Sequence, residues 1–222
     1  MPLIVLATRN NHKAAELAAM LGDKFTVKTL RDFPAAPETI EDAPTFHGNA
    51  TKKAVTLANW LTQFNWSDSF VLADDSGLEV DALGGDPGVR SARFAATNET
   101  GNSPDAANNE KLLRLLAPIP RPWTARFRCV IAFTPIPEAP KETASNTCLL
   151  DEAEAATRLF DGACEGQIIP TPQGAHGFGY DPLFIPNGFT QTFAELGDDQ
   201  KNRISHRAEA MKKFLTALRA QS

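Results

Sequence analysis

Two adjacent carboxylates, Asp74 and Asp75, follow an apolar run at residues 70–73 and precede Ser76 and Gly77. Acids at the end of a strand can start a turn, because an Asp side chain hydrogen-bonds to its own backbone there. The Asp-Ser-Gly order also matches half of an aspartic protease site. Carboxylates are, in addition, the ligands that Mg²⁺ takes in phosphate chemistry. The stretch leaves three interpretations open: a turn, a protease or a metal site.

The protease interpretation conflicts with the rest of the chain. Such enzymes pair two Asp-Ser/Thr-Gly loops, whereas this chain has one copy. Its 222 residues are too many for the small dimeric type, and it has too much predicted helix for an all-β fold. A metal site needs a further acid, because successive strand residues point to opposite faces and only one of Asp74 and Asp75 can face it squarely. Glu41, in a loop before a predicted helix, is the candidate, and an ordinary solvated acid is its alternative.

Three polar side chains, Thr8, Asn10 and Lys13, lie between a predicted strand and the start of a helix. Backbone N–H groups and the helix dipole favour an anion at such a position, so the loop is a candidate phosphate site. Asn49 and Lys53 share one helix face and could add an amide and a charge. Taken alone, each feature also fits a capped helix with solvated side chains.

The loop at residues 174–182, GAHGFGYDP, has the composition of a ligand-binding loop. Its three glycines allow close backbone approach, and Phe178 and Tyr180 could stack on a nucleobase. Asp181 could accept from ring N–H groups, and residues 205–207 open a helix with donors suited to a base carbonyl oxygen. The alternatives are a β-turn with core aromatics and a capped helix.

The elements that must position these residues alternate along the chain. We expect strands at 3–7, 25–30, 70–73 and 126–133, an extended piece at 78–83, and helices at 14–21, 46–64, 108–116 and after Ser205. Residues 134–140 are expected to form a loop, and 147–160 fit either a helix or a strand. The alternation predicts an α/β fold with a mixed sheet.

Composition narrows the function classes. The net charge of −5 disfavours a nucleic-acid or anionic-membrane surface. No signal peptide or membrane-spanning run is apparent, so we expect no membrane partner. Cys129, Cys148 and Cys164 show no metal-binding spacing and fit reduced thiols. We therefore expect a soluble, cytoplasmic protein.

Taken in order, the motifs resemble the inosine/xanthosine triphosphate pyrophosphatase family. They are T-x-N-x-x-K, F-x-x-N-A-x-x-K-A, A-D-D-S-G-L-x-V-x-A-L-x-G-x-P-G-V-x-S-A-R-F, G-F-G-Y-D-P-x-F and K-x-x-x-S-H-R. The resemblance runs from residue 3 to about 218. It implies an elongated mixed β-sheet flanked by helices, in a single domain (1–222) of two lobes with a central cleft. It also implies a homodimer that uses Mg²⁺ to hydrolyse ITP, dITP and XTP to the monophosphate and pyrophosphate, cleaning the nucleotide pool.

The resemblance also implies roles for individual residues. Asp75 is the general base, and the metal acids are Glu41, Asp75 and a supporting Asp74. The substrate-binding residues are Thr8, Asn10, Lys13, Lys53, Ser76, Phe178, Gly179, Tyr180, Asp181, Lys201, His206 and Arg207.

Two departures from the family pattern stand out. Gly48 precedes Asn49 where family members often carry Glu, so Glu41 must carry more of the metal binding. Residues 135–158 look longer than the family's usual strand and turn. Two rival functions stay open: a related pyrophosphatase with another base preference, and a nucleotide-binding regulator that has lost catalysis.

Overall fold

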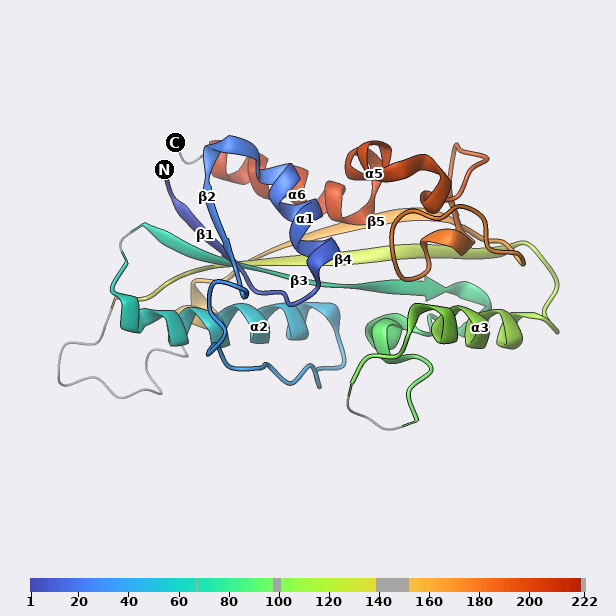
Figure 1. Cartoon of the computed structure of the whole chain (residues 1–222), viewed down its shortest axis with the longest axis horizontal. Coiled ribbons are helices and arrows are strands. Elements are labelled where there is room, and N and C mark those ends of the chain that lie inside the picture. The colour runs from blue at the N-terminus through green and yellow to red at the C-terminus, as the bar shows by residue number, and fades with distance from the viewer. Residues whose placement is uncertain (67, 98–100, 139–151, 221–222) are drawn as a thin grey trace. The chain divides into compact units, whose positions relative to one another are not determined.

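A computed structural model describes residues 1–66, 68–97, 101–138 and 152–220, in which strands and helices alternate from β1 to β4 (Figure 1). The strands are β1 (Leu3–Leu6), β2 (Thr26–Thr29), β3 (Ser69–Val80), β4 (Trp123–Pro135), β5 (Arg158–Ile168) and β6 (Phe184–Pro186). The α-helices with assigned bounds are α1 (Asn11–Leu21), α2 (Phe46–Leu61), α3 (Asp105–Leu116), α5 (Phe193–Ile204) and α6 (His206–Arg219). Their positions confirm the main predicted elements.

The strands form one six-stranded sheet in the order β2-β1-β3-β4-β5-β6. β1 is parallel to both β2 and β3, whereas β5 and β6 are antiparallel. The predicted α/β fold with a mixed sheet is therefore confirmed.

The chain divides into two compact units, and the first contains residues 1–75, 130–160 and 214–222. Its β1-α1-β2 and β2-α2-β3 crossovers run in opposite directions across the sheet. Because such connections are right-handed, α1 and α2 cover opposite faces of these strands (Figure 1). Buried apolar side chains of the strands and both helices form the core, among them Ile4, Leu72, Leu17, Ala54 and Ala58.

The second unit contains residues 76–129 and 161–213. Its core includes Leu78 and Val80 from β3, Leu112 and Leu116 from α3, and a cluster of aromatic rings. In that cluster Phe127 lies 4.8 Å from Phe184 and 6.0 Å from Phe193, measured between ring centroids. The arrangement is tilted and edge-to-face, as aromatic pairs prefer.

The expected strand end at residue 73 is wrong, and with it the interpretation of the two acids as the start of a turn. Strand β3 continues without interruption from Ser69 to Val80, so Asp74 and Asp75 lie in mid-strand. The turn prediction rested on the tendency of Asp, Ser and Gly to leave a strand. Compensation of each acid by a lysine, described below, allows the strand to carry both.

Residues 134–160, expected to form a loop followed by a helix or a strand, are described only in part. Thr134 and Pro135 belong to β4 rather than to the expected loop, and residues 158–160 begin β5. Most of the unusual segment 135–158 lies outside the described residues. Among the residues that are described, no helix is both long and apolar enough to cross a membrane.

Candidate active site

Asp74 and Asp75 each meet a lysine from a different helix. The Asp74 carboxylate lies 2.5 Å from Lys13 Nζ on α1, and Asp75 Oδ1 accepts from Lys53 Nζ on α2 at 2.9 Å. Only 1% of Asp74 and 5% of Asp75 is exposed. Because strand neighbours point to opposite faces and the two helices cover opposite faces, each buried charge gains its own partner.

Glu41 joins this group through the same lysine. Its Oε2 lies 3.2 Å from Lys53 Nζ, so one ammonium bridges Glu41 and Asp75. Buried Asn49 holds the Glu41 loop by accepting from Ala43 N at 2.9 Å and donating to Ala43 O at 3.3 Å. The motif Asn49 therefore supports the loop through its backbone, whereas we expected its amide to face a phosphate.

Gly48 explains how the loop comes so close to α2. A Cβ added at this position would lie 2.7 Å from Ala43 Cβ, well inside normal contact. A larger side chain at position 48 would therefore displace the loop that carries Glu41. In this chain the packing around position 48 therefore suits Gly and not the Glu that family members often carry there.

We expect Gly48→Ala to destabilise the folded chain by about 1–3 kcal/mol, the usual cost of overpacking. Adding Ala43→Gly should restore part of that loss, because it removes the atom that the new Cβ meets. Urea unfolding of both single variants and the double variant measures the coupling. Strictly additive losses would show that the two positions do not meet.

The electrostatics of the group favour a basic Asp75. Burial raises the pKa of Asp75 to about 6, with Glu41 adding to the rise and the Lys53 and Lys13 charges opposing it. Burial also raises the pKa of Glu41, but the Lys53 charge, the neighbouring Asp75 side chain and the Lys13 charge outweigh it and hold that pKa below its ordinary value. Burial lowers the pKa of Lys53, yet the carboxylates of Asp75, Glu41 and Asp74 leave it raised. At neutral pH both acids and the lysine are charged.

The metal-free protein is expected to show Asp75 titrating near pH 6 instead of its ordinary value of 3.8. The free energy of unfolding linked to this group should fall as pH rises between those values, because the folded state holds the proton more tightly. A carboxyl-carbon NMR titration measures the midpoint, with Asp75→Asn identifying the resonance. A midpoint near 4 would contradict the effect of burial.

The donor set fits a hard divalent cation. Asp75 Oδ2 is buried and has no hydrogen-bond partner among the described residues, and Glu41 supplies a second carboxylate on the same lysine. Mg²⁺ typically takes one or two carboxylates and fills its other positions with substrate phosphates and water. The predicted three-acid set is not assembled: no group of three metal-binding side chains occurs in the described part of the chain, and Asp74 faces Lys13.

The polar loop before α1 is organised by its own side chains. Asn10 Oδ1 accepts from the amides of His12 and Lys13 at 2.9 and 3.1 Å, and Thr8 Oγ1 accepts from Asn10 N at 3.1 Å. Three backbone donors of the loop that we expected to meet a phosphate are thus paired. Thr8, Asn10 and Lys13 are nevertheless gathered at one helix start, as predicted.

In the second unit, the loop ending at Asp181 is built around a buried ion pair. Asp181 Oδ2 lies 2.5 Å from Lys201 Nζ and accepts from Phe178 N at 2.9 Å. Lys201 Nζ also lies 4.3 Å from the centroid of the Phe178 ring, a cation–π contact. Gly177, at φ +76°, leaves space for the Asp181 carboxylate that any side chain would fill.

Tyr180 and Asp181 differ from their predicted roles. Tyr180 is 3% exposed, packs in the core and donates its hydroxyl to Ser91 O at 2.9 Å. Its ring therefore has no open face for a base, and of the two predicted aromatic side chains Phe178 is the one that can offer a stacking surface. Asp181 is buried with Lys201, so in this structure it orients the loop.

The remaining predicted residues also meet in this unit. Arg207 Nη2 donates to Ser76 Oγ at 3.0 Å, and the guanidinium carbon lies 6.0 Å from the Phe178 centroid. The His206 ring stacks on Phe127 at 4.8 Å with an interplanar angle of 13°. Ser205 Oγ accepts from Ala208 N at the start of α6, which confirms the predicted cap.

Sequence reasoning missed two residues that contact this loop. Gly179 N donates to Asp105 Oδ2 at 2.6 Å, and Asn109 Nδ2 donates to Gly179 O at 3.0 Å. Both belong to α3. In the sequence they are polar residues four apart on a helix, a spacing that also fits a solvated face, so only the fold identifies them.

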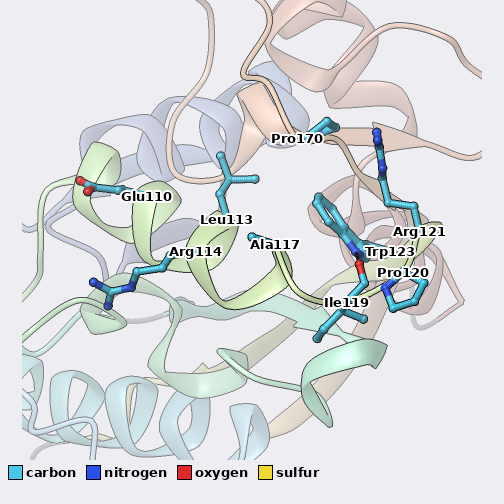
Figure 2. Close-up of a pocket in the computed structure, with 9 residues that line it drawn as sticks. All are labelled: Glu110, Leu113, Arg114, Ala117, Ile119, Pro120, Arg121, Trp123 and Pro170. Carbon is cyan, nitrogen blue, oxygen red and sulfur yellow. Dashed lines mark hydrogen bonds between the residues drawn. The ribbon is translucent and has the colours of Figure 1, made fainter.

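A surface pocket of about 740 Å³ lies elsewhere in the second unit (Figure 2). It is lined by Glu110, Leu113, Arg114, Ala117, Ile119, Pro120, Arg121, Trp123 and Pro170. None of these is a predicted site residue. The chemistry of the candidate site therefore rests on the side-chain contacts described above and not on this pocket.

The mixed sheet, with lysines from two helices against its buried carboxylates, defines an α/β protein whose charged groups suit a phosphorylated ligand. The chain belongs to the Ham1 family, whose model matches residues 4–217.

Relatives of known name agree with this assignment. A dITP/XTP pyrophosphatase of Shouchella clausii is 45% identical over 217 residues, covering 97% of this chain and 94% of that protein. A protein of the same name from Geobacter sulfurreducens is 44% identical, covering 95% and 94%. The structure of a HAM1 protein from Coxiella burnetii matches with a TM-score of 0.78 and 35% identity, covering 99% of this chain and all of that one.

Proposed function

We propose that this chain is a nucleoside triphosphate pyrophosphatase that hydrolyses dITP, ITP and XTP to the monophosphate and pyrophosphate. The observation that carries the proposal is the Glu41–Lys53–Asp75 group, found in a chain that is 45% identical to a protein named dITP/XTP pyrophosphatase. Removing such nucleotides would clean the nucleotide pool.

Asp75 acts as the general base. Its buried Oδ2 lacks a hydrogen-bond partner among the described groups, and its two lone pairs could serve the cation and the proton of an attacking water. In the metal-free protein burial raises the pKa of this carboxyl to about 6, which still leaves it ionised at neutral pH. The water attacks the α-phosphorus, and pyrophosphate leaves.

The lysines oppose the charge of the triphosphate. Lys53 holds Asp75 and Glu41 in place, and Lys13 lies at the start of α1 against Asp74. With Thr8 and Asn10, they form the proposed phosphate-binding group. Ammonium donors near the leaving pyrophosphate would stabilise the charge that develops on it.

Glu41 and Asp75 would hold a divalent cation, which we propose is Mg²⁺, with Asp74 supporting the pair. When bound, such an ion supplies Lewis-acid stabilisation of phosphate charge. The two carboxylates meet its preference for hard oxygen ligands.

The second unit supplies the base-recognition residues. Phe178 offers a stacking surface, next to Gly179, and Lys201 and Arg207 lie near its ring. His206 and Arg207 would donate to the 6-keto oxygen of a deaminated purine, and Ser76 would contact the substrate. A 6-amino purine has no acceptor at that position. A site with donors at that position leaves them unpaired when adenine binds, and this costs affinity.

A substrate panel tests the proposal. Purified protein is given dITP, XTP, dATP, dGTP and dUTP, with and without Mg²⁺, and released pyrophosphate is measured. We expect turnover of dITP and XTP, with kcat/KM at least about 10²-fold above that for dATP, and dependence on the metal. Activity confined to pyrimidines, or none on any nucleotide, would refute the proposal.

We further propose that residues 1–222 form one catalytic domain that works as a homodimer in the cytoplasm. The family match over residues 4–217 supports a single domain. Light scattering of the purified chain would give its mass in solution, and the value for one chain, 24.0 kDa, would refute the dimer.

A further inference from the structure

The backbone of Gly179 is held on both sides by α3. Its N–H donates to Asp105 Oδ2 at 2.6 Å, and its carbonyl accepts from Asn109 Nδ2 at 3.0 Å. Asp105 and Asn109 are four residues apart and so lie on one face of the helix. One helix face therefore satisfies the donor and the acceptor of a single loop residue.

The two hydrogen bonds to Gly179 fix the backbone of the loop next to Phe178. The φ of +62° at Gly179 is a left-handed conformation that favours glycine, although space for a Cβ is available. The hydrogen bond to Asp105 fixes the peptide between Phe178 and Gly179, and the bond from Asn109 fixes the next one. Together they set the direction in which Phe178 leaves the loop.

The other side of the loop is fixed independently. Phe178 N donates to Asp181 Oδ2, which pairs with Lys201 from α5. Phe178 therefore sits between two anchors, one on α5 and one on α3. The α5 anchor belongs to the predicted site, whereas the α3 anchor has no assigned role.

The Asn109 amide has one end paired with Gly179 and, within the described part of the chain, the other end unpaired. Its Oδ1 is buried and has no hydrogen-bond partner among the described residues, which costs folding free energy. Rotating the amide would bring Oδ1 against the Gly179 carbonyl, so the observed orientation is the one that serves Gly179. The hydrogen bond to the Gly179 carbonyl best accounts for the Asn109 side chain and its orientation.

We propose that Asp105 and Asn109 are positioning residues that set the base selectivity of the nucleotide site through Gly179 and Phe178. The inference rests on the proposed function, because it takes Phe178 as the surface on which the base stacks. A purely structural anchor would affect stability and all substrates alike. A positioning pair affects binding of the base and leaves binding of the phosphates unchanged.

The test compares Asp105→Ala and Asn109→Ala with Glu110→Gln, a change at an exposed residue of the same helix. Calorimetry measures binding of dIMP and, separately, of inorganic pyrophosphate to each protein, and kinetics give kcat and KM for dITP, dGTP and dATP. For both alanine variants we expect dIMP binding and kcat/KM for dITP to weaken about tenfold, mainly through KM. Pyrophosphate binding should stay within about twofold of wild type, and selectivity for dITP should fall.

Asp105→Asn provides a rescue control. Its side-chain carbonyl can still accept from Gly179 N, so its loss should be smaller than that of Asp105→Ala. Equal weakening of dIMP and pyrophosphate, or unchanged selectivity in both alanine variants, would overturn the inference while wild-type activity on dITP upholds the proposed function. A wild-type protein inactive on dITP and XTP would refute the proposed function, and the inference with it.

Discussion

Asp75→Asn is expected to lower kcat for dITP by about 10²–10⁴-fold, the usual contribution of a general base. The amide keeps the size of the side chain and can still accept from Lys53, but it cannot take a proton from water. The carboxylate is ionised at neutral pH, since the pKa that burial gives it in the metal-free protein is about 6. Steady-state rates of pyrophosphate release at saturating dITP measure the effect.

The matched control is Asp23→Asn, which makes the same chemical change at an exposed residue. It should leave kcat unchanged. Thermal unfolding of both variants separates a loss of chemistry from a loss of fold. Equal rates for wild type and Asp75→Asn would remove Asp75 from the mechanism and favour the alternative that the chain only binds nucleotides.

Asp181→Ala is expected to destabilise the folded state by about 3–5 kcal/mol, as removal of one partner of a buried ion pair does elsewhere. The Lys201 ammonium, 1% exposed, would lose the carboxylate that lies 2.5 Å away. Phe178 N would lose its acceptor at the same time. Urea unfolding of wild type and variant measures the difference.

Replacing both partners should recover much of that stability. The double variant Asp181→Leu with Lys201→Met leaves no buried charge at the pair, so its free energy of unfolding should lie closer to wild type than that of Asp181→Ala. Its affinity for dIMP should stay low, because the α5 anchor of Phe178 is gone. A loss below 1 kcal/mol for Asp181→Ala alone would show that the pair is not buried in solution.

Local patterns sufficed to predict most of the fold of the first unit. The apolar run at 3–6, the helical spacing ending at Gly22 and the long face of α2 all depend on near neighbours in the sequence. Strand β3 did not follow from local pattern, because an Asp-Asp-Ser-Gly stretch favours a turn. Its continuation depends on Lys13 and Lys53, which come from two different helices.

The candidate site, too, could be predicted only in part from the sequence. Motif order selects the candidate residues, and in the structure Lys53 contacts both Glu41 and Asp75. The sequence could not show that Tyr180 is a core residue, since the type of an aromatic residue in a loop does not reveal whether its ring is exposed. Nor could it find Asp105 and Asn109, whose role depends on where α3 meets a loop 70 residues away.

Hydrolysis of dITP in ¹⁸O-labelled water, followed by ³¹P NMR of the products, tests the central claim most directly. A water activated by Asp75 and attacking the α-phosphorus places the label on dIMP and leaves the released pyrophosphate unlabelled. Label in the pyrophosphate, release of orthophosphate, or the same labelled product at an equal rate with Asp75→Asn would contradict the account.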